Sequence, residues 1–262
     1  MRAHRVLVLA ATLLASPRAG ADPSPRFPRG TKAADVTICL QPLGAHDAAV
    51  TAAIGRGIEG AYGFRTTTLA PRALAAAAYY QPRKRHRADR LLDDLVAHVV
   101  PTAGCAIVLG VTGADISIAK DDHPDWGIMG LAYLDSQVAV VSTFRTRRGV
   151  SRRRMLERTV KVATHELGHA LGLDHDDSVA GCMMNDARGT VRTVDTETGV
   201  PCRHEREALE ARLGVDLPDV TGLDWDRVVG GQPAAATPPR RNDVGAMPRL
   251  RLKARLNANS DS

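Results

Sequence analysis

The stretch SRRRMLERTVKVATHELGHALGLDHD, residues 151–176, combines a long helical pattern with three histidines. Ser151 is a typical helix N-cap, and the apolar residues that follow it keep a helical period as far as Leu171. Gly172 is expected to end the helix, because glycine enters the left-handed conformation at low cost. The chain can then turn back toward the helix and bring His175 with it.

The first two histidines lie four residues apart, which is about one helical turn, so both imidazoles project from one face. With His175 they form three neutral ligands, which suit a tetrahedral zinc ion that keeps one position open for water. Zinc lowers the pKa of such a water to about 7. Glu166 points beside the metal without binding it. The stretch therefore predicts a zinc hydrolase with metal ligands His165, His169 and His175 and with Glu166 as the general base.

Strands and helices alternate upstream of this helix, which indicates an α/β domain with a mostly parallel sheet. The expected strands are 35–44, 64–69 and 104–111, with two adjacent strands in 126–145, and the expected helices are 47–62, 88–100 and 202–213. The basic cluster RKRHR (83–87) is interpreted as a solvated surface in a loop. The segment KDDHPDW (120–126) is interpreted as a solvated loop as well.

The N-terminus is typical of a secretory signal peptide, with two arginines, a short apolar run and the small-residue site Ala19-Gly20-Ala21. The expected organisation is a signal peptide (1–21), a flexible leader (22–34), one domain (35–224) and a disordered basic tail (225–262). No apolar run is long enough to span a bilayer. We therefore expect a secreted or periplasmic protein without a membrane span.

The net charge of +6 is concentrated at the two ends of the chain. Three arginines lie in the expected signal peptide, and six basic residues against two acidic ones lie after Gly230. The part between is close to neutral. Because nucleic-acid binding needs a basic face on the folded domain, no nucleic-acid partner is expected.

The sequence HELGHALGLDH resembles the extended zinc motif of the metzincin peptidases, and Met184 stands where that clan has a methionine turn beneath the metal. The segment CMM (182–184) is followed by seventeen residues and then Cys202, a spacing that resembles the archaemetzincins in particular. GLA (130–132) and AVVSTFR (139–145) extend the likeness, which covers roughly residues 35–210. The reprolysin-type metzincins, which share the aspartate after the third histidine, are the alternative family.

This resemblance implies a metzincin-type catalytic domain: a mixed, mostly parallel twisted sheet, a long active-site helix and a small C-terminal subdomain. It implies one catalytic Zn²⁺, a structural role for Met184, and a peptide or protein substrate for a monomeric zinc endopeptidase. It also implies an edge strand, expected at Gln137 to Thr143, to which the substrate would add as an antiparallel strand.

Archaemetzincins usually carry four cysteines that resemble a second, structural zinc site, but here Asp176 and Glu205 stand at the first and last positions. In an exported chain we expect a disulfide between Cys182 and Cys202 in place of that zinc. A second bridge is expected between Cys39 and Cys105. The alternative is a second zinc held by Cys182, Cys202 and either Asp176 or His204.

A second hypothesis keeps the scaffold and the zinc but uses the cleft to hold a partner without turnover. Glu166 argues against it, because a purely binding zinc site does not need a carboxylate there. A third hypothesis assigns the function to the basic tail, which would attach the protein to an acidic cell surface or to nucleic acid.

Overall fold

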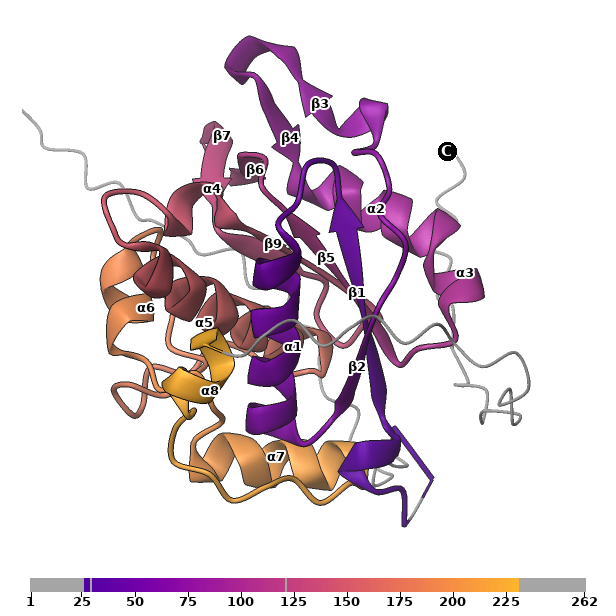
Figure 1. Cartoon of the computed structure of the whole chain (residues 1–262), viewed down its shortest axis with the longest axis vertical. Coiled ribbons are helices and arrows are strands. Elements are labelled where there is room, and N and C mark those ends of the chain that lie inside the picture. Colours follow the sequence, from indigo (N-terminus) through magenta and orange to yellow (C-terminus); the bar gives the residue numbers. More distant parts are fainter. Residues whose placement is uncertain (1–25, 29, 121, 231–262) are drawn as a thin grey trace, which may run out of the picture.

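The computed structural model describes residues 26–28, 30–120 and 122–230, which form a five-stranded sheet with helices on both faces (Figure 1). The strand order is β2 (Arg65–Thr68), β1 (Thr37–Leu43), β5 (Ile107–Thr112), β9 (Val138–Ser142) and β8 (Gly130–Ala132). The first four strands are parallel, and β8 is antiparallel to β9. The expected α/β class with a mostly parallel sheet is therefore confirmed.

Alternating side chains of the central strands build one core on each face of the sheet. Ile38 and Leu40 of β1 pack with the helices α1 (Ala48–Tyr62) and α5 (Arg152–Ala170). Cys39 lies between them in sequence and packs on the other face, against α2 (Ala88–His98). This alternation follows from the two-residue period of a strand, and it explains why the central strands are apolar on both faces.

The ends of α5 match the sequence prediction. The Ser151 side chain accepts a hydrogen bond from the Arg154 amide (3.2 Å), and the helix stops at Ala170. Gly172 follows with a φ of 103°, which L side chains rarely adopt. This turn reverses the chain and determines the position of residues 173–176.

The remaining elements are short. A second sheet has the order β3 (Tyr79–Tyr80), β4 (Arg85–Arg87), β6 (Ile116–Lys120) and β7 (His123–Ile128). The other helices are η1 (Ala33–Asp35), η2 (Ala76–Ala78), η3 (Gln81–Arg83), α3 (Val100–Ala103), α4 (Thr143–Thr146), α6 (Val191–Thr196), α7 (Arg203–Leu213) and α8 (Trp225–Gly230). None of the helices that the structure describes combines the length and hydropathy needed to cross a bilayer.

Two segments interpreted as solvated loops are strands of the second sheet, so this interpretation was wrong. Residues 85–87 form β4, and residues 123–128 form β7. Arg85 lies 2.8 Å from a carboxylate oxygen of Asp115 and 2.9 Å from one of Asp125, whose side chains are only 9% and 4% exposed. The basic cluster neutralises buried carboxylates, which composition alone does not reveal. Trp126 belongs to this sheet too, so 126–145 is divided between two sheets.

The edge strand was also assigned wrongly. Residues 138–142 form β9, which pairs with β5 on one side and with β8 on the other. The edge strand on this side of the sheet is β8, the GLA segment, and β2 is the edge strand on the other side. Periodicity reveals that a strand is buried, but only the pairing reveals which strand has a free side.

Parts of the expected leader and tail lie within the described residues and pack against the domain. The Arg26 side chain is 9% exposed, and its guanidinium donates to the carbonyls of Ala170 (2.8 Å) and Ser136 (2.6 Å), which fixes this part of the leader. Helix α8 occupies the first residues of the expected tail and packs against α1. The expected signal peptide (1–21) and residues 231–262 of the expected tail lie outside the described residues.

Two disulfides are present, Cys39–Cys105 and Cys182–Cys202. The first joins β1 to the segment that leads into β5. The second ties the loop around Met184 to the N-cap residue of α7. Each bridge therefore connects elements that surround the long helix α5 or support its sheet.

Replacing Cys182 and Cys202 together by alanine is expected to lower the free energy of unfolding by about 3 kcal/mol, because the bridge closes a loop of 20 residues. Urea unfolding under non-reducing conditions, with Cys39–Cys105 intact, measures this. An unchanged midpoint would show that the bridge does not hold the loop.

Candidate metal centre and cleft

Three histidines converge at the end of α5. His165 and His169 come from the helix, and His175 comes from the segment after Gly172. Their ligand atoms all lie within 4.8 Å of one another. The structure thus brings together the three residues that the sequence singled out.

Backbone carbonyls orient two of these rings. The Nδ1 atom of His165 donates to the Met183 carbonyl (2.7 Å), and that of His169 donates to the Leu173 carbonyl (2.8 Å). Because a carbonyl only accepts, both Nδ1 atoms carry the proton and both Nε2 atoms keep a free lone pair. Burial lowers the pKa of His165 to about 3, so this ring is neutral, as a metal ligand must be.

The spacing of the nitrogen atoms fits a zinc ion. The Nε2 atoms of His169 and His175 are 3.2 Å apart. Two tetrahedral ligands with Zn–N near 2.05 Å are about 3.3 Å apart. The lone pair on His169 Nε2 also favours a cation at this point. The residues present therefore fit a zinc ion bound by three histidines.

A methionine loop lies beneath this cluster. Met183 and Met184 are fully buried, and a β-carbon added to Gly168 would meet the Met184 sulfur at 2.6 Å. The Met184 amide donates to Glu205 Oε1 (2.9 Å), and the Met184 carbonyl accepts from the Asp176 amide (3.0 Å). Met184 therefore packs under the helix turn that carries the histidines.

A second group of metal-ligating types, Cys182, His204 and Glu205, lies beside this loop. Cys182 is in a disulfide, so it offers no thiolate. Both carboxylate oxygens of Glu205 accept backbone amides, from Met184 and from Cys202 (2.7 Å), and His204 pairs with Asp176 at 3.0 Å. These groups already have partners, which explains how the loop is held.

Glu166 is 8% exposed and lines the same cavity as the histidines. Burial, and then the charge of Glu197, raise the pKa of Glu166 to about 8. A cation at the histidine cluster would oppose this effect. The carboxyl group is therefore suited to exchanging a proton near neutral pH.

The cavity has a volume of about 380 Å³ and lies between the edge strand β8 and helix α5. Gly130 of β8 passes very close to Glu166, since a β-carbon added there would lie 2.5 Å from the carboxyl oxygen. The lining also includes Trp126 of β7, Val162 of α5 and Glu197, which follows α6. The sequence offers no signal for Glu197, and GLA (130–132) marks only a family likeness that does not reveal the contact of Gly130 with Glu166.

Comparison with known sequences identifies one family. The profile of Peptidase family M54 matches residues 77–211. The archaemetzincin of Haloarcula marismortui is 32% identical over 166 residues, which cover 60% of this chain and 90% of that protein.

Solved structures agree. The crystal structure of archaemetzincin from Methanopyrus kandleri superposes with a TM-score of 0.60 at 26% identity and covers 71% of this chain and 98% of that one. That of Archaeoglobus fulgidus archaemetzincin, complexed with malonate, gives 0.56 at 26% identity, with 66% and 99% covered.

Replacing Gly130 by alanine is expected to lower the free energy of unfolding by about 1–3 kcal/mol, because the new methyl group overlaps the Glu166 side chain. The matched control is Gly222→Ala, where a β-carbon has no neighbour within 4 Å. Urea unfolding compares the two. If both variants unfold together with the wild type, the strand and the helix are not as close as described.

Proposed function

The chain belongs to peptidase family M54 and is a zinc metallopeptidase, and from this premise we propose that it is an exported endopeptidase whose site is the histidine cluster. The metal ligands of this proposal are His165, His169 and His175. The observation that carries it is the 3.2 Å approach of two imidazole Nε2 atoms beside a buried glutamate. We propose a single catalytic zinc per chain.

Zinc held by three neutral histidines supplies a Lewis acid that lowers the pKa of water and polarises a peptide carbonyl. Glu166 accepts the proton of the attacking water and delivers it to the leaving amine. Gly130 lies against the Glu166 side chain, and this close contact keeps bulk water away from the carboxyl group. Met184 has a structural role, because it supports the helix turn from below.

The substrate is proposed to bind along β8. This strand is the edge of the main sheet on the side of the histidine cluster, and its three residues all line the cavity. An extended peptide can pair with such an edge through backbone hydrogen bonds, and here we assign the antiparallel direction. The peptide then lies above α5, with its scissile bond over the histidine cluster.

Export is supported by the signal-like N-terminal sequence and by the two disulfides, which persist in oxidising compartments. We propose a secreted or periplasmic location. The test is the N-terminal sequence of the protein recovered outside the cytoplasm of its host, which should begin after Ala21.

The activity is tested by incubating the zinc-loaded mature chain with a mixed peptide library and identifying products by mass spectrometry. A chelated sample serves as the control for the metal. Cleavage that disappears on chelation is the expected result. A chain that binds zinc, cleaves nothing and still captures peptides would instead support the hypothesis of a binding protein without turnover.

Replacing Glu166 by glutamine is expected to lower kcat/KM by at least about 100-fold, because the amide cannot accept the proton, while the zinc content stays the same. The matched control is Glu157→Gln on the same helix, where the glutamate pairs with Arg153 and Arg154 outside the cavity. Loss of zinc from the Glu166 variant would contradict the assigned role.

A further inference from the structure

A second buried glutamate lines the cleft and is not used by the proposed reaction. Glu197 is 4% exposed, and its Oε1 atom has no hydrogen-bond partner. Buried carboxylate oxygens normally have a donor, so an orphan atom in a cavity wall calls for an explanation. The inference below rests on the proposed peptidase function.

The nearby lysine does not pair with this carboxyl group. Lys161 is buried, and its Nζ atom donates to the carbonyls of Val194 (3.1 Å) and Asp195 (3.4 Å). Its charge lowers the pKa of Glu197, but burial acts more strongly and raises that pKa to about 8. Among the residues that the structure describes, Glu197 therefore has no cation in direct contact.

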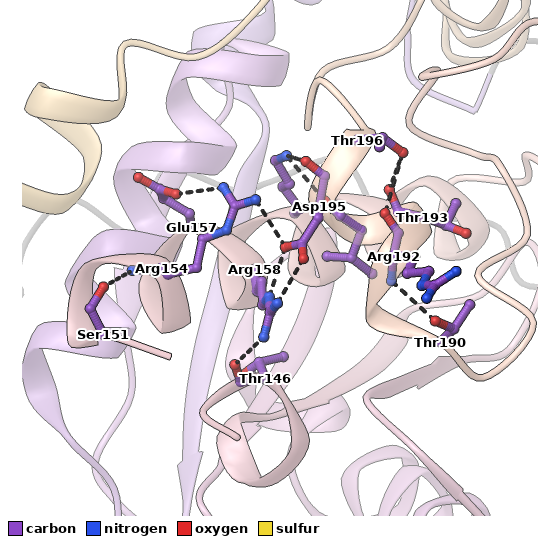
Figure 2. Close-up of polar contacts among 12 residues, drawn as sticks. Thr146, Ser151, Arg154, Glu157, Arg158, Thr190, Arg192, Thr193, Asp195 and Thr196 are labelled. Carbon is purple, nitrogen blue, oxygen red and sulfur yellow. Dashed lines mark hydrogen bonds and ion pairs between the residues drawn. The ribbon is translucent and has the colours of Figure 1, made fainter. Parts of the chain in front are cut away.

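Helix α6 holds Glu197 in this place. Figure 2 shows Asp195 of α6 between two arginines of α5. Arg158 makes two parallel hydrogen bonds of 2.7 Å to the Asp195 carboxylate, and Arg154 lies 3.2 Å from it. A bidentate pair of this kind fixes orientation as well as distance. The segment that ends at Glu197 is thus fastened to the helix that carries the histidines.

The direction of β8 shows which part of a substrate would meet Glu197. Gly130 lies over Glu166, whereas Asp135 and Ser136 donate their amides to the carbonyls of His169 and Ala170. The segment from β8 onward therefore runs in the same sense as α5. An antiparallel peptide on β8 runs in the opposite sense, so residues after the scissile bond lie toward Val162, one turn before Glu166.

The cavity wall at that end has the residue types that a long basic side chain requires. Val162 and Val194 line it with apolar surface, and Glu197 adds a carboxylate. Lysine and arginine carry a methylene stem that packs on apolar walls and a cationic head that needs an anion. A leucine would leave the carboxylate oxygen unpartnered.

We propose that Glu197 is a specificity-determining residue that accepts the cationic head of a lysine or arginine directly after the scissile bond. The substrates of this chain are then peptides cleaved on the N-terminal side of a basic residue. In such a complex the buried Glu197 carboxyl group gains a cationic partner.

The test uses one cleaved peptide from the library, resynthesised with Lys, Arg, Leu or Glu directly after the scissile bond. The wild-type chain is expected to prefer Lys and Arg over Leu by roughly 10- to 100-fold in kcat/KM. Glu197→Gln should remove that preference, with the Leu peptide cleaved as well as before. The control Glu207→Gln, at an exposed glutamate of α7 that pairs with Arg203, should keep it.

Two kinetic results would overturn the proposal. One is a wild-type chain that cleaves the Leu peptide as well as the Lys peptide. The other is a Glu197→Gln variant that loses activity on all four peptides in proportion, which would indicate a merely structural role.

Failure of the peptidase function itself would appear differently, as a zinc-loaded chain that cleaves nothing. In that case the affinities of the chain for the Lys and Leu forms of a labelled library peptide decide the question. Tighter binding of the Lys form that depends on Glu197 supports the basic site, and equal affinity rejects it.

Discussion

The cleft depends on the close approach of one loop to the last turns of α5. The Met183 carbonyl accepts the Nδ1 proton of His165, so the loop determines which nitrogen of that ring is free to bind a metal. Gly168 permits the approach, because any side chain at this position would overlap the Met184 sulfur. The disulfide to Cys202 and the hydrogen bond from the Met184 amide to Glu205 hold the loop from below. The loop around Met184 therefore orients a metal ligand, packs against α5 and connects α5 to the C-terminal helix α7.

The cleft contains two buried carboxyl groups, Glu166 and Glu197, to which we assign different roles. Glu166 lies between the edge strand and the histidines, whereas Glu197 is brought into the cavity by α6 and the Arg158–Asp195 pair. Burial raises the pKa of both groups to about 8, so without a cation both are largely protonated near neutral pH. A zinc ion beside the first, and a basic side chain beside the second, would favour the ionised form of each. The cleft is thus built to bind positive charge at two places.

The sequence predicted those features that follow from local spacing. The turn at Gly172, the cap at Ser151 and the histidine spacing each depend on residues within one or two turns of the helix. Features that depend on distant partners were missed or misassigned. The sequence alone does not show that Arg85 contacts the buried carboxylates of Asp115 and Asp125. It also does not show that β8 pairs with β9, so the assignment of β9 as an edge strand was wrong. Gly130 and Glu197 are single residues whose meaning comes only from the opposite wall of the cleft.

We propose that three histidines, and no cysteine, bind the metal of this chain. Zinc X-ray absorption spectroscopy of the purified mature protein tests this ligand set directly. We expect a shell of nitrogen and oxygen neighbours at about 2.0–2.1 Å without sulfur at about 2.3 Å. A sulfur shell would contradict it, because the zinc would then be held by cysteines that are placed here in disulfides.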